Sequence, residues 1–309
     1  EDKAKVPSRA YSGVAKGDWA KVKAYYRMID QPEESEVNMS NILAPHRKRT
    51  VRRMMGQRTV LCIQDGSELN YTNLDKCEGL GEIVSNQTGA KRRGLVLHST
   101  FAVAPNGLPL GVLRAQCIAP EGKSQEETRP AYAIPIEEKK TFSWIDHHRD
   151  LVALSARLPQ TRLVHVCDRE ADFFEMFDEQ RQNPCVELLV RAKHNRNIAE
   201  EPFKLFEAVS KEPVSERIQI HVPRKSARSK KSKQKASPAR SERVADLAIR
   251  HRHVHLPASH YHRDKEPIKL CIVHALEENP PYDAKPVEWF LPTTIKVTSG
   301  EEAVQCLRW

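Results

Sequence analysis

The stretch Val164-His165-Val166-Cys167-Asp168-Arg169-Glu170-Ala171-Asp172 decides the fold of this chain. An apolar run that begins at Leu163 stops at the Asp168 carboxylate, and apolar residues then recur at helical spacing, at Phe173, Met176 and Phe177. The pattern predicts a strand that delivers Asp168 to its carboxyl-terminal tip, a common place for a ligand over a sheet. Asp168 could instead simply cap the helix that follows. Both interpretations stay open on this stretch alone.

A second stretch has the same design. Thr59-Val60-Leu61-Cys62-Ile63-Gln64-Asp65 is an apolar strand that ends at a carboxylate, and Gly66 follows it. Two aspartates at two strand tips can share a divalent metal ion. Their oxygen ligands suit a hard cation such as Mg²⁺, or Mn²⁺ in its place. We therefore predict a metal site formed by Asp65 and Asp168.

Composition narrows the class of protein. The 309 residues are 39% hydrophobic and 29% charged, with a net charge of +9, which favours a polyanionic partner such as nucleic acid or an anionic membrane. We expect no membrane span, because no apolar run is long enough, and no signal peptide, because the first residues are polar. Seven cysteines without a Cys-x-x-Cys spacing predict a reducing, cytoplasmic protein that has neither disulfides nor structural zinc.

The hydrophobic periodicity predicts an α/β order of elements. Two helices are expected before residue 57, and the second carries a basic cluster that is either a solvated face or a phosphate contact: His46, Arg47, Lys48, Arg49, Arg52 and Arg53. Three strands, a helix, a strand, a helix and a strand follow, at Thr59–Gln64, Gly94–Ala104, Leu108–Ile118, Glu137–Leu158, Leu163–Cys167, Glu170–Gln180 and Val186–Val190.

Four stretches occur in an order that resembles the DDE transposases of bacterial cut-and-paste insertion sequences, the group that includes the Tn-five transposase. They are the Asp65 strand, Arg93-Gly94-Leu95-Val96-Leu97-His98-Ser99, Cys167 to Asp172, and Val190-Arg191-Ala192-Lys193-His194. The resemblance spans roughly Trp19 to the C-terminus. It implies an RNase H-like mixed sheet flanked by helices, interrupted by a β-rich insertion. In that fold the first and fourth strands are neighbours, which would bring Asp65 and Asp168 together.

The resemblance also implies a domain organisation. Residues 1–57 would be a helical segment that follows an N-terminal DNA-binding domain absent from this chain, and residues 58–199 the first part of the catalytic core. Residues 200–285 would be the insertion, with strands at Glu216–Val222, Arg243–His255 and Pro267–Leu276, and with a basic, low-complexity loop at 224–240. That loop is either solvated or an arm along DNA. Residues 286–309 would return to the core as a strand, Val287–Thr294, and a helix capped by Ser299 and Glu302.

Further site residues follow from the resemblance. Arg191, Lys193 and Arg196 would contact the transposon end, unless they are ordinary surface charges, and Trp289 would stack on a flipped base, unless it is core. The family's third catalytic residue, a glutamate within a Tyr…Arg…Glu…Lys signature, has no match in this chain, and we expect it beyond Trp309. Gly66 and Asn195 depart from the family pattern, which carries Thr and often Pro at these positions.

The leading hypothesis is a DDE-type transposase region that performs Mg²⁺-dependent DNA strand cleavage and strand transfer as a homodimer on transposon ends and target DNA. Without the third carboxylate, the alternatives are a catalytically inactive DNA-binding transposase remnant or an RNase H-like nuclease. A cytoplasmic scaffold would require Asp65 and Asp168 to lie far apart. The alternating His251, His253 and His255 could form a metal face, although a solvated or DNA-facing surface is the alternative.

Overall fold

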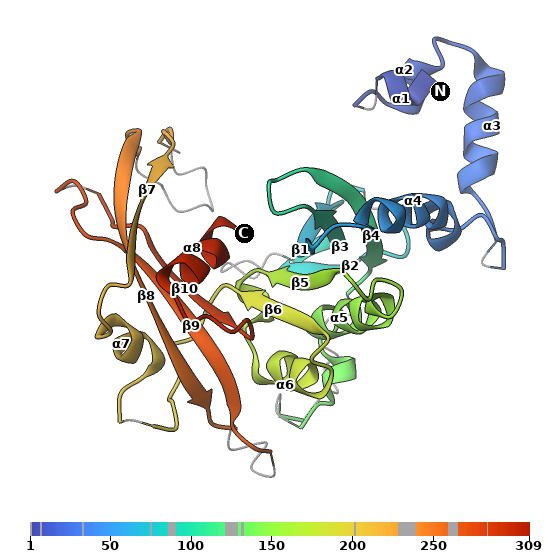
Figure 1. The fold of residues 1–309 in the computed structure, drawn as a ribbon. Helices are drawn as coiled ribbons and strands as arrows, with labels where there is room; N and C mark the ends of the chain where they lie inside the picture. The colour runs from blue at the N-terminus through green and yellow to red at the C-terminus, as the bar shows by residue number, and fades with distance from the viewer. Residues whose placement is uncertain are drawn as a thin grey trace.

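The computed structural model describes residues 2–309 except 7, 33, 75, 86–90, 121–128, 131–132, 201, 228–238, 259–264 and 283. It is an α/β structure in which helices flank an open, mixed sheet of ten strands (Figure 1). The strands are β1 (Thr59–Asn70), β2 (Gly81–Ser85), β3 (Lys91–Val103), β4 (Pro109–Ile118), β5 (Arg162–Cys167), β6 (Val186–Val190), β7 (Glu216–Val222), β8 (Arg243–Leu256), β9 (Ile268–Glu277) and β10 (Glu288–Thr293). The helices are α1 (Asp2–Lys5), α2 (Tyr11–Val14), α3 (Trp19–Ile29), α4 (Met39–Met54), η1 (Ile136–Glu138), α5 (Phe142–Ser155), η2 (Arg169–Ala171), α6 (Phe174–Gln182), α7 (Leu205–Ser210) and α8 (Gly300–Arg308).

The centre of the sheet is formed by β1, β5 and β6. The strand order is β2-β3-β1-β5-β6-β10-β9-β8-β7, and β4 pairs with β3 as well. β1 is antiparallel to β3 but parallel to β5, in a register that joins Leu61 to Val164 and Gln64 to Cys167. β6 is parallel to β5 in turn. The prediction that the strands Thr59–Gln64 and Leu163–Cys167 are neighbours is therefore confirmed.

The prediction that the first strand ends at Gln64 is wrong. β1 continues through Asp65 to Asn70, because β3 pairs with it over its whole second half, from Asp65 opposite Ser99 to Asn70 opposite Gly94. The polar sequence of this half signals exposure rather than a strand end, and most of its residues are indeed exposed. Asp65 is therefore held inside a strand and not at a free tip.

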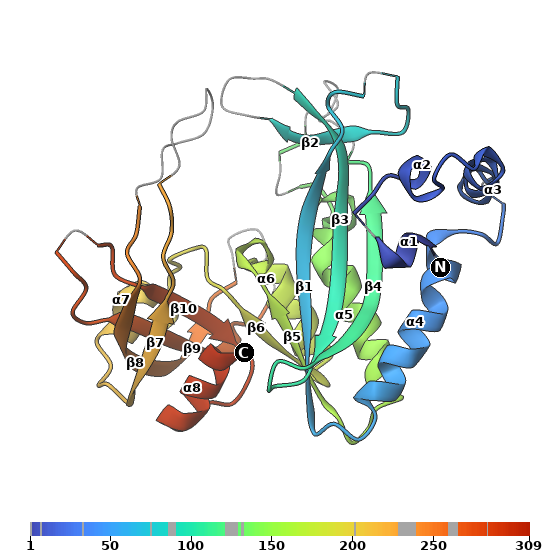
Figure 2. The ribbon, with the colours of Figure 1, turned by 90° about the horizontal axis from the view of Figure 1, so that it is seen from above.

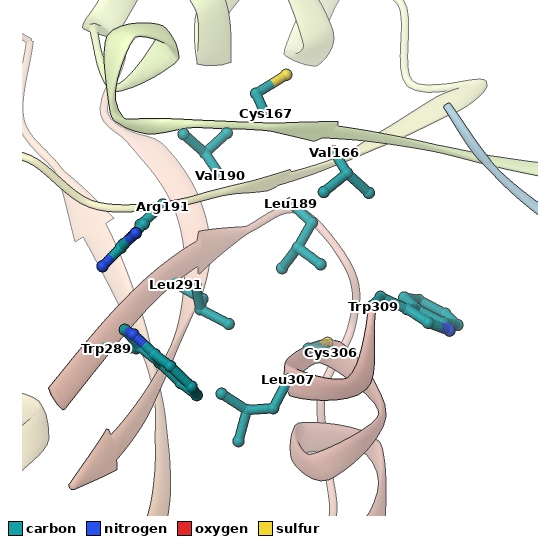
Figure 3. Close-up of a pocket in the computed structure, with 10 residues that line it drawn as sticks. All are labelled: Val166, Cys167, Leu189, Val190, Arg191, Trp289, Leu291, Cys306, Leu307 and Trp309. Carbon is teal, nitrogen blue, oxygen red and sulfur yellow. The ribbon is translucent and has the colours of Figure 1, made fainter. Parts of the chain in front are cut away.

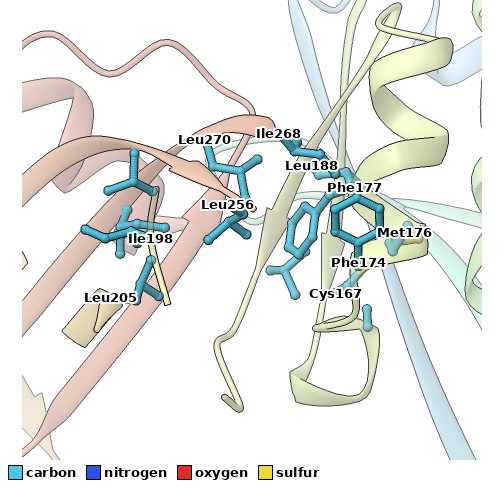
Figure 4. Close-up of a cluster of buried hydrophobic side chains, with 14 of the residues drawn as sticks. Cys167, Phe174, Met176, Phe177, Leu188, Ile198, Leu205, Leu256, Ile268 and Leu270 are labelled. Atoms are coloured by element: carbon cyan, nitrogen blue, oxygen red, sulfur yellow. The ribbon is translucent and has the colours of Figure 1, made fainter. Parts of the chain in front are cut away.

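Helices cover the two faces of the sheet differently. α5 and α4 pack against Val60, Cys62 and Leu163 on one face, and α8 packs against Val164 and Leu189 on the other. A third cluster of buried side chains joins α6 to β5, β6 and β9 (Figure 4). The predicted helices at Glu137–Leu158 and Glu170–Gln180 are each found as a short 3-10 turn followed by a helix, namely η1 with α5 and η2 with α6.

The strands predicted after residue 200 are all present and extend the same sheet. β9 pairs with β10, and β10 pairs with β6 through Thr293 opposite Leu189. The expected return of the chain to the main sheet at β10 is therefore confirmed. Only the ends of the basic loop at 224–240 lie within the described residues, where Lys225 and Arg240 form an isolated bridge.

The N-terminal helices project from the body of the molecule (Figure 2). Val22 is the only buried residue of α3, while Trp19, Tyr26 and Ile29 are exposed. α4 instead packs on β4, where Gly111 has a positive φ and a Cβ added there would lie 2.4 Å from the Thr50 hydroxyl. The close approach of α4 to β4 therefore requires glycine at this position.

Candidate functional site

Asp65, Asp168 and Arg191 form a row across three parallel strands. The last register pairs are Gln64 with Cys167 and Cys167 with Val190, so each of the three residues is one position past these pairs, Asp65 within β1 and the other two directly after β5 and β6. The Arg191 amide donates a hydrogen bond to the Cys167 carbonyl at 3.1 Å, which keeps β6 in this register. Neighbouring strands lie about 4.8 Å apart. The two aspartates that the sequence predicts as a pair are thus on adjacent strands at one level of the sheet.

The two carboxylates belong to the α8 face. Ile63 and Val166 pack in the cluster beneath α8, and side chains two positions apart on a strand share a face. Asp65 lies within β1, and Asp168 keeps an extended backbone, with φ −78° and ψ −169°. Both side chains are exposed. They are therefore accessible to a ligand that approaches this edge.

Each aspartate uses one oxygen locally. Asp65 Oδ1 accepts a hydrogen bond from the Gly66 amide at 2.9 Å, and Asp168 Oδ1 accepts one from the Glu170 amide at 2.8 Å. Asp168 is thus the cap of η2, so the capping interpretation is correct as far as it goes. Within the described residues, the second oxygen of each carboxylate accepts no hydrogen bond. That oxygen remains available to a cation.

The charges of Asp65 and Asp168 affect the pKa values of neighbouring side chains. Burial lowers the pKa of His98, while Asp65 and Asp168 both act to raise it. Desolvation and the Asp168 charge raise the pKa of Glu170, and Lys193 opposes them. Carboxylates, a lysine and a histidine from four separate segments therefore interact electrostatically at this edge.

The donor set fits one shared hard cation. Asp65 and Asp168 would be its ligands, because carboxylate oxygens are what Mg²⁺ and Mn²⁺ prefer. Across the described part of the chain, no group of three or more His, Cys, Asp or Glu side chains is close enough to hold a metal ion. Glu302 does not supply a third ligand, since its carboxylate accepts hydrogen bonds from Thr298 at the start of α8. Its amide bonds to the Ser299 hydroxyl, as the predicted cap requires.

The three predicted DNA-contacting cations differ in their surroundings. Arg191 and Lys193 are exposed, and Arg191 is near enough to Asp168 for that charge to act on its pKa, which burial and Arg169 lower. Arg196 is instead turned inward, where its guanidinium donates to Asp172 Oδ1 at 2.6 Å. The structure thus places Arg191 and Lys193 at the open edge and Arg196 in a partly buried ion pair.

A pocket adjoins the row at Arg191. Its volume is about 260 Å³, and Trp289 lies along its wall opposite the end of α8 (Figure 3). The lining residues are Val166, Cys167, Leu189, Val190, Arg191, Trp289, Leu291, Cys306, Leu307 and Trp309. Trp289 is half-buried, so it is neither core nor a free surface side chain. Sequence reasoning missed the opposite wall, although Cys306 and Trp309 are spaced to share one face of a helix.

A buried polar network lies on the other face of the same strands, and sequence reasoning did not find it. Gln64 Oε1 bonds to His165 Nε2 at 2.9 Å, and His165 Nδ1 lies 3.2 Å from His148 Nδ1. His147 Nδ1 bonds to the Thr100 hydroxyl at 2.7 Å. Burial lowers the pKa of His147 to about 3 and that of His148 to about 4. These histidines are therefore neutral at neutral pH.

The histidine face on β8 is occupied by protein partners. His251 bonds to the Ser215 hydroxyl, His253 to the Val297 carbonyl and His255 to the Glu200 carboxylate. The three side chains thus use ring nitrogens for separate contacts. Nothing in these contacts favours the metal-face hypothesis.

Comparison with known families does not assign the chain. No helix among the described residues is both long enough and apolar enough to span a bilayer. A search of the sequence against models of known protein families finds no match. The assignment of a function therefore depends on the geometry of the aspartate pair, the cations and the pocket.

Proposed function

We propose that this chain is the catalytic region of a DDE-type transposase, which performs Mg²⁺-dependent DNA strand cleavage and strand transfer at transposon ends. The observation that carries the proposal is the placement of Asp65 and Asp168 on adjacent parallel strands, one position past their last register pair. Two hard-oxygen ligands at one sheet edge are suited to phosphoryl transfer.

The order of the strands supports an RNase H-like core. β4, β3 and β1 form an antiparallel series, and β5 and β6 follow on the other side of β1, both parallel to it. This arrangement, with a helix between successive parallel strands, is the one that the resemblance implies. The strand order agrees with a fold on which nucleic-acid chemistry occurs, while the proposed function rests on the residues of the site itself.

The residues of the site would have three different roles. Asp65 and Asp168 would hold a divalent ion, which when bound activates a water or a 3′-hydroxyl and neutralises charge on the phosphate. Arg191 and Lys193 lie beside the carboxylates and offer positive charge to the DNA backbone. Trp289 offers an aromatic face on which an unstacked base could rest, next to Arg191. The net charge of +9 favours the same polyanionic substrate.

The first test compares Mg²⁺ and Mn²⁺ binding, by calorimetry, in the parent chain and in Asp65→Ala and Asp168→Ala. We expect weak binding in the parent and none in either variant, because each substitution removes half of the donor set. Glu68→Ala is the matched control, since Glu68 lies on the same strand and is exposed. Binding that survives both aspartate substitutions would refute the site. A transposon-end cleavage assay with the same variants then tests the reaction.

A second candidate is a DNA-binding protein of the same ancestry that does not cut DNA, acting as a dimer or alone. The observation in its favour is the two-carboxylate site, because no three-ligand group occurs among the described residues. Salt-dependent DNA binding without Mg²⁺-dependent nicking would support this candidate over the first. Cleavage that requires both Asp65 and Asp168 would exclude it.

A further inference from the structure

The segment Arg191–Arg196 is held in place by the buried carboxylate of Asp172. Asp172 is 4% exposed, and its Oδ2 accepts hydrogen bonds from two consecutive backbone amides, those of Lys193 at 2.6 Å and His194 at 2.9 Å. Its Oδ1 accepts a hydrogen bond from the Arg196 guanidinium at 2.6 Å. Hydrogen bonds to an ionised carboxylate are short and strong, so Asp172 fixes both the path and the end of this segment.

The rest of the segment is tied down by other elements. The Ala192 amide donates to the Phe290 carbonyl of β10 at 2.8 Å. Asn195 Oδ1 accepts from the Phe206 amide at 2.9 Å, and its side-chain amide donates to Glu207. The backbone from Ala192 to Arg196 therefore has a defined course without any ligand.

Two cations point away from this anchored backbone. Arg191 and Lys193 are exposed and form no ion pair with the described residues, and their charges act on Asp168 and Glu170 respectively. Arg196 differs, because the buried Asp172 carboxylate already neutralises it. The segment thus presents two available positive charges beside the aspartate pair and keeps a third as a structural partner.

We propose that Asp172 is a positioning residue, which holds the Arg191–His194 backbone so that Arg191 and Lys193 meet the phosphates of a DNA strand lying over Asp65 and Asp168. The identity of the ligand rests on the proposed function. Arg196 is, in this account, the counter-charge of the anchor and not a contact to DNA.

A positioning role and simple electrostatics predict opposite effects of Asp172→Ala on the affinity for DNA. Removing a negative charge from a surface that binds DNA should strengthen binding, and freeing the Arg196 guanidinium should strengthen it further. A positioning role predicts weaker binding when Asp172 becomes alanine, because Lys193 is no longer held. Asparagine retains a carbonyl oxygen that can accept both backbone hydrogen bonds, so Asp172→Asn should rescue binding.

The experiment measures binding of the full chain to a short labelled DNA duplex over a salt series, with thermal melting as the check on folding. Lys193→Ala should reduce the slope of log K against log salt by about 0.9, the value for one phosphate contact. Asp172→Ala should reduce it by at least as much, and adding Lys193→Ala to it should change little. Arg196→Gln should leave the slope near that of the parent. Tighter or unchanged binding by Asp172→Ala, or full additivity with Lys193→Ala, would overturn the proposal.

Amide hydrogen exchange at Lys193 and His194 tests the anchor without DNA. Protection at these two amides should fall by about tenfold or more in Asp172→Ala and persist in Asp172→Asn. Unchanged protection would overturn the anchoring role. A parent chain that binds no duplex would refute the proposed function and the DNA ligand of this segment, whereas the exchange result would still decide whether Asp172 holds it.

Discussion

The two faces of β1 and β5 carry polar side chains that are close together in sequence but differ in exposure. On the α5 face, Gln64 and His165 are 1% and 0% exposed and are hydrogen-bonded to each other. On the α8 face, Asp65 and Asp168 are exposed and each keeps an uncommitted oxygen. Burial lowers the pKa of His165 and keeps its imidazole neutral, and exposure leaves the two aspartates able to bind a cation. The alternation of a strand therefore separates a structural network from a candidate site with no intervening residue.

The largest difference that we expect between the two faces is in stability at low pH, where the buried histidines of the α5 face destabilise the folded chain. The pKa values of His147, His148 and His165 are lowered by burial, to about 3 and about 4 for the first two. Below the ordinary pKa near 6.5, the unfolded chain therefore binds more protons than the folded one, and stability falls as the pH falls. Each histidine contributes up to about 1.4 kcal/mol per pH unit.

Urea denaturation between pH 7.5 and pH 5 measures this loss, in a range where most carboxylates remain ionised. The midpoint should change little from pH 7.5 to about pH 6.5 and should then fall steeply as the pH decreases towards 5. A flat profile would show that these histidines are accessible to protons in the folded chain.

On the α8 face the largest effect should be on chemistry. Asp65→Asn and Asp168→Asn should each lower Mg²⁺-dependent DNA cleavage by about 10²–10³-fold or more, the scale at which removing one transition-state charge contact acts. Folding should be nearly unaffected, with a change in the free energy of unfolding within about 0.5 kcal/mol for these exposed side chains. An aspartate variant that lost both stability and activity would contradict the prediction that the α8 face acts in chemistry and not in folding.

A smaller effect should follow from Gln64→Leu, one residue away from Asp65. Gln64 bonds to His165 and donates to the Ser143 carbonyl at 3.1 Å, so its loss leaves buried polar groups without partners. The free energy of unfolding should fall by about 1–3 kcal/mol. Chemical denaturation measures this free energy. Mg²⁺ binding by the folded variant should match that of the parent. Asp65→Asn is the adjacent control.

The smallest effect concerns the pocket beside the row. Trp289→Ala should weaken binding of a single-stranded oligonucleotide by about 1 kcal/mol, the low end for loss of one base–aromatic stack. Binding of intact duplex should change less, because stacked bases cannot reach the ring. Tyr282→Ala is the control, since Tyr282 is fully exposed at 107% and does not line the pocket. Equal losses for the two variants would argue against a role for the pocket in binding a base.

Local sequence patterns predicted the two strands that carry the aspartates, and the family resemblance predicted that they are neighbours. Two apolar runs ending in Asp65 and Asp168 predicted two strands, and the fold implied by the resemblance made them neighbours, as the register shows. The second half of β1 was missed, because its polar residues are held in a strand by β3, which no local propensity reveals.

The contacts that were missed join residues far apart in the chain. Arg196 meets Asp172 across 24 positions, and Gln64 meets His165 across 101. Nothing in the spacing of these residues marks them as partners. Periodicity identifies which face a side chain occupies, but the partner on that face is fixed only when the strands and helices have packed.

The pairing of β10 with both β6 and β9 has a consequence for cooperativity. The segment that contains β7, β8 and β9 joins the central strands through β10, so it has no sheet edge of its own at that boundary. The segment should melt with the core in one transition, and excising it would expose the backbone of β10 as a new edge open to pairing with other chains. The region expected as an insertion is thus continuous with the central sheet through β10.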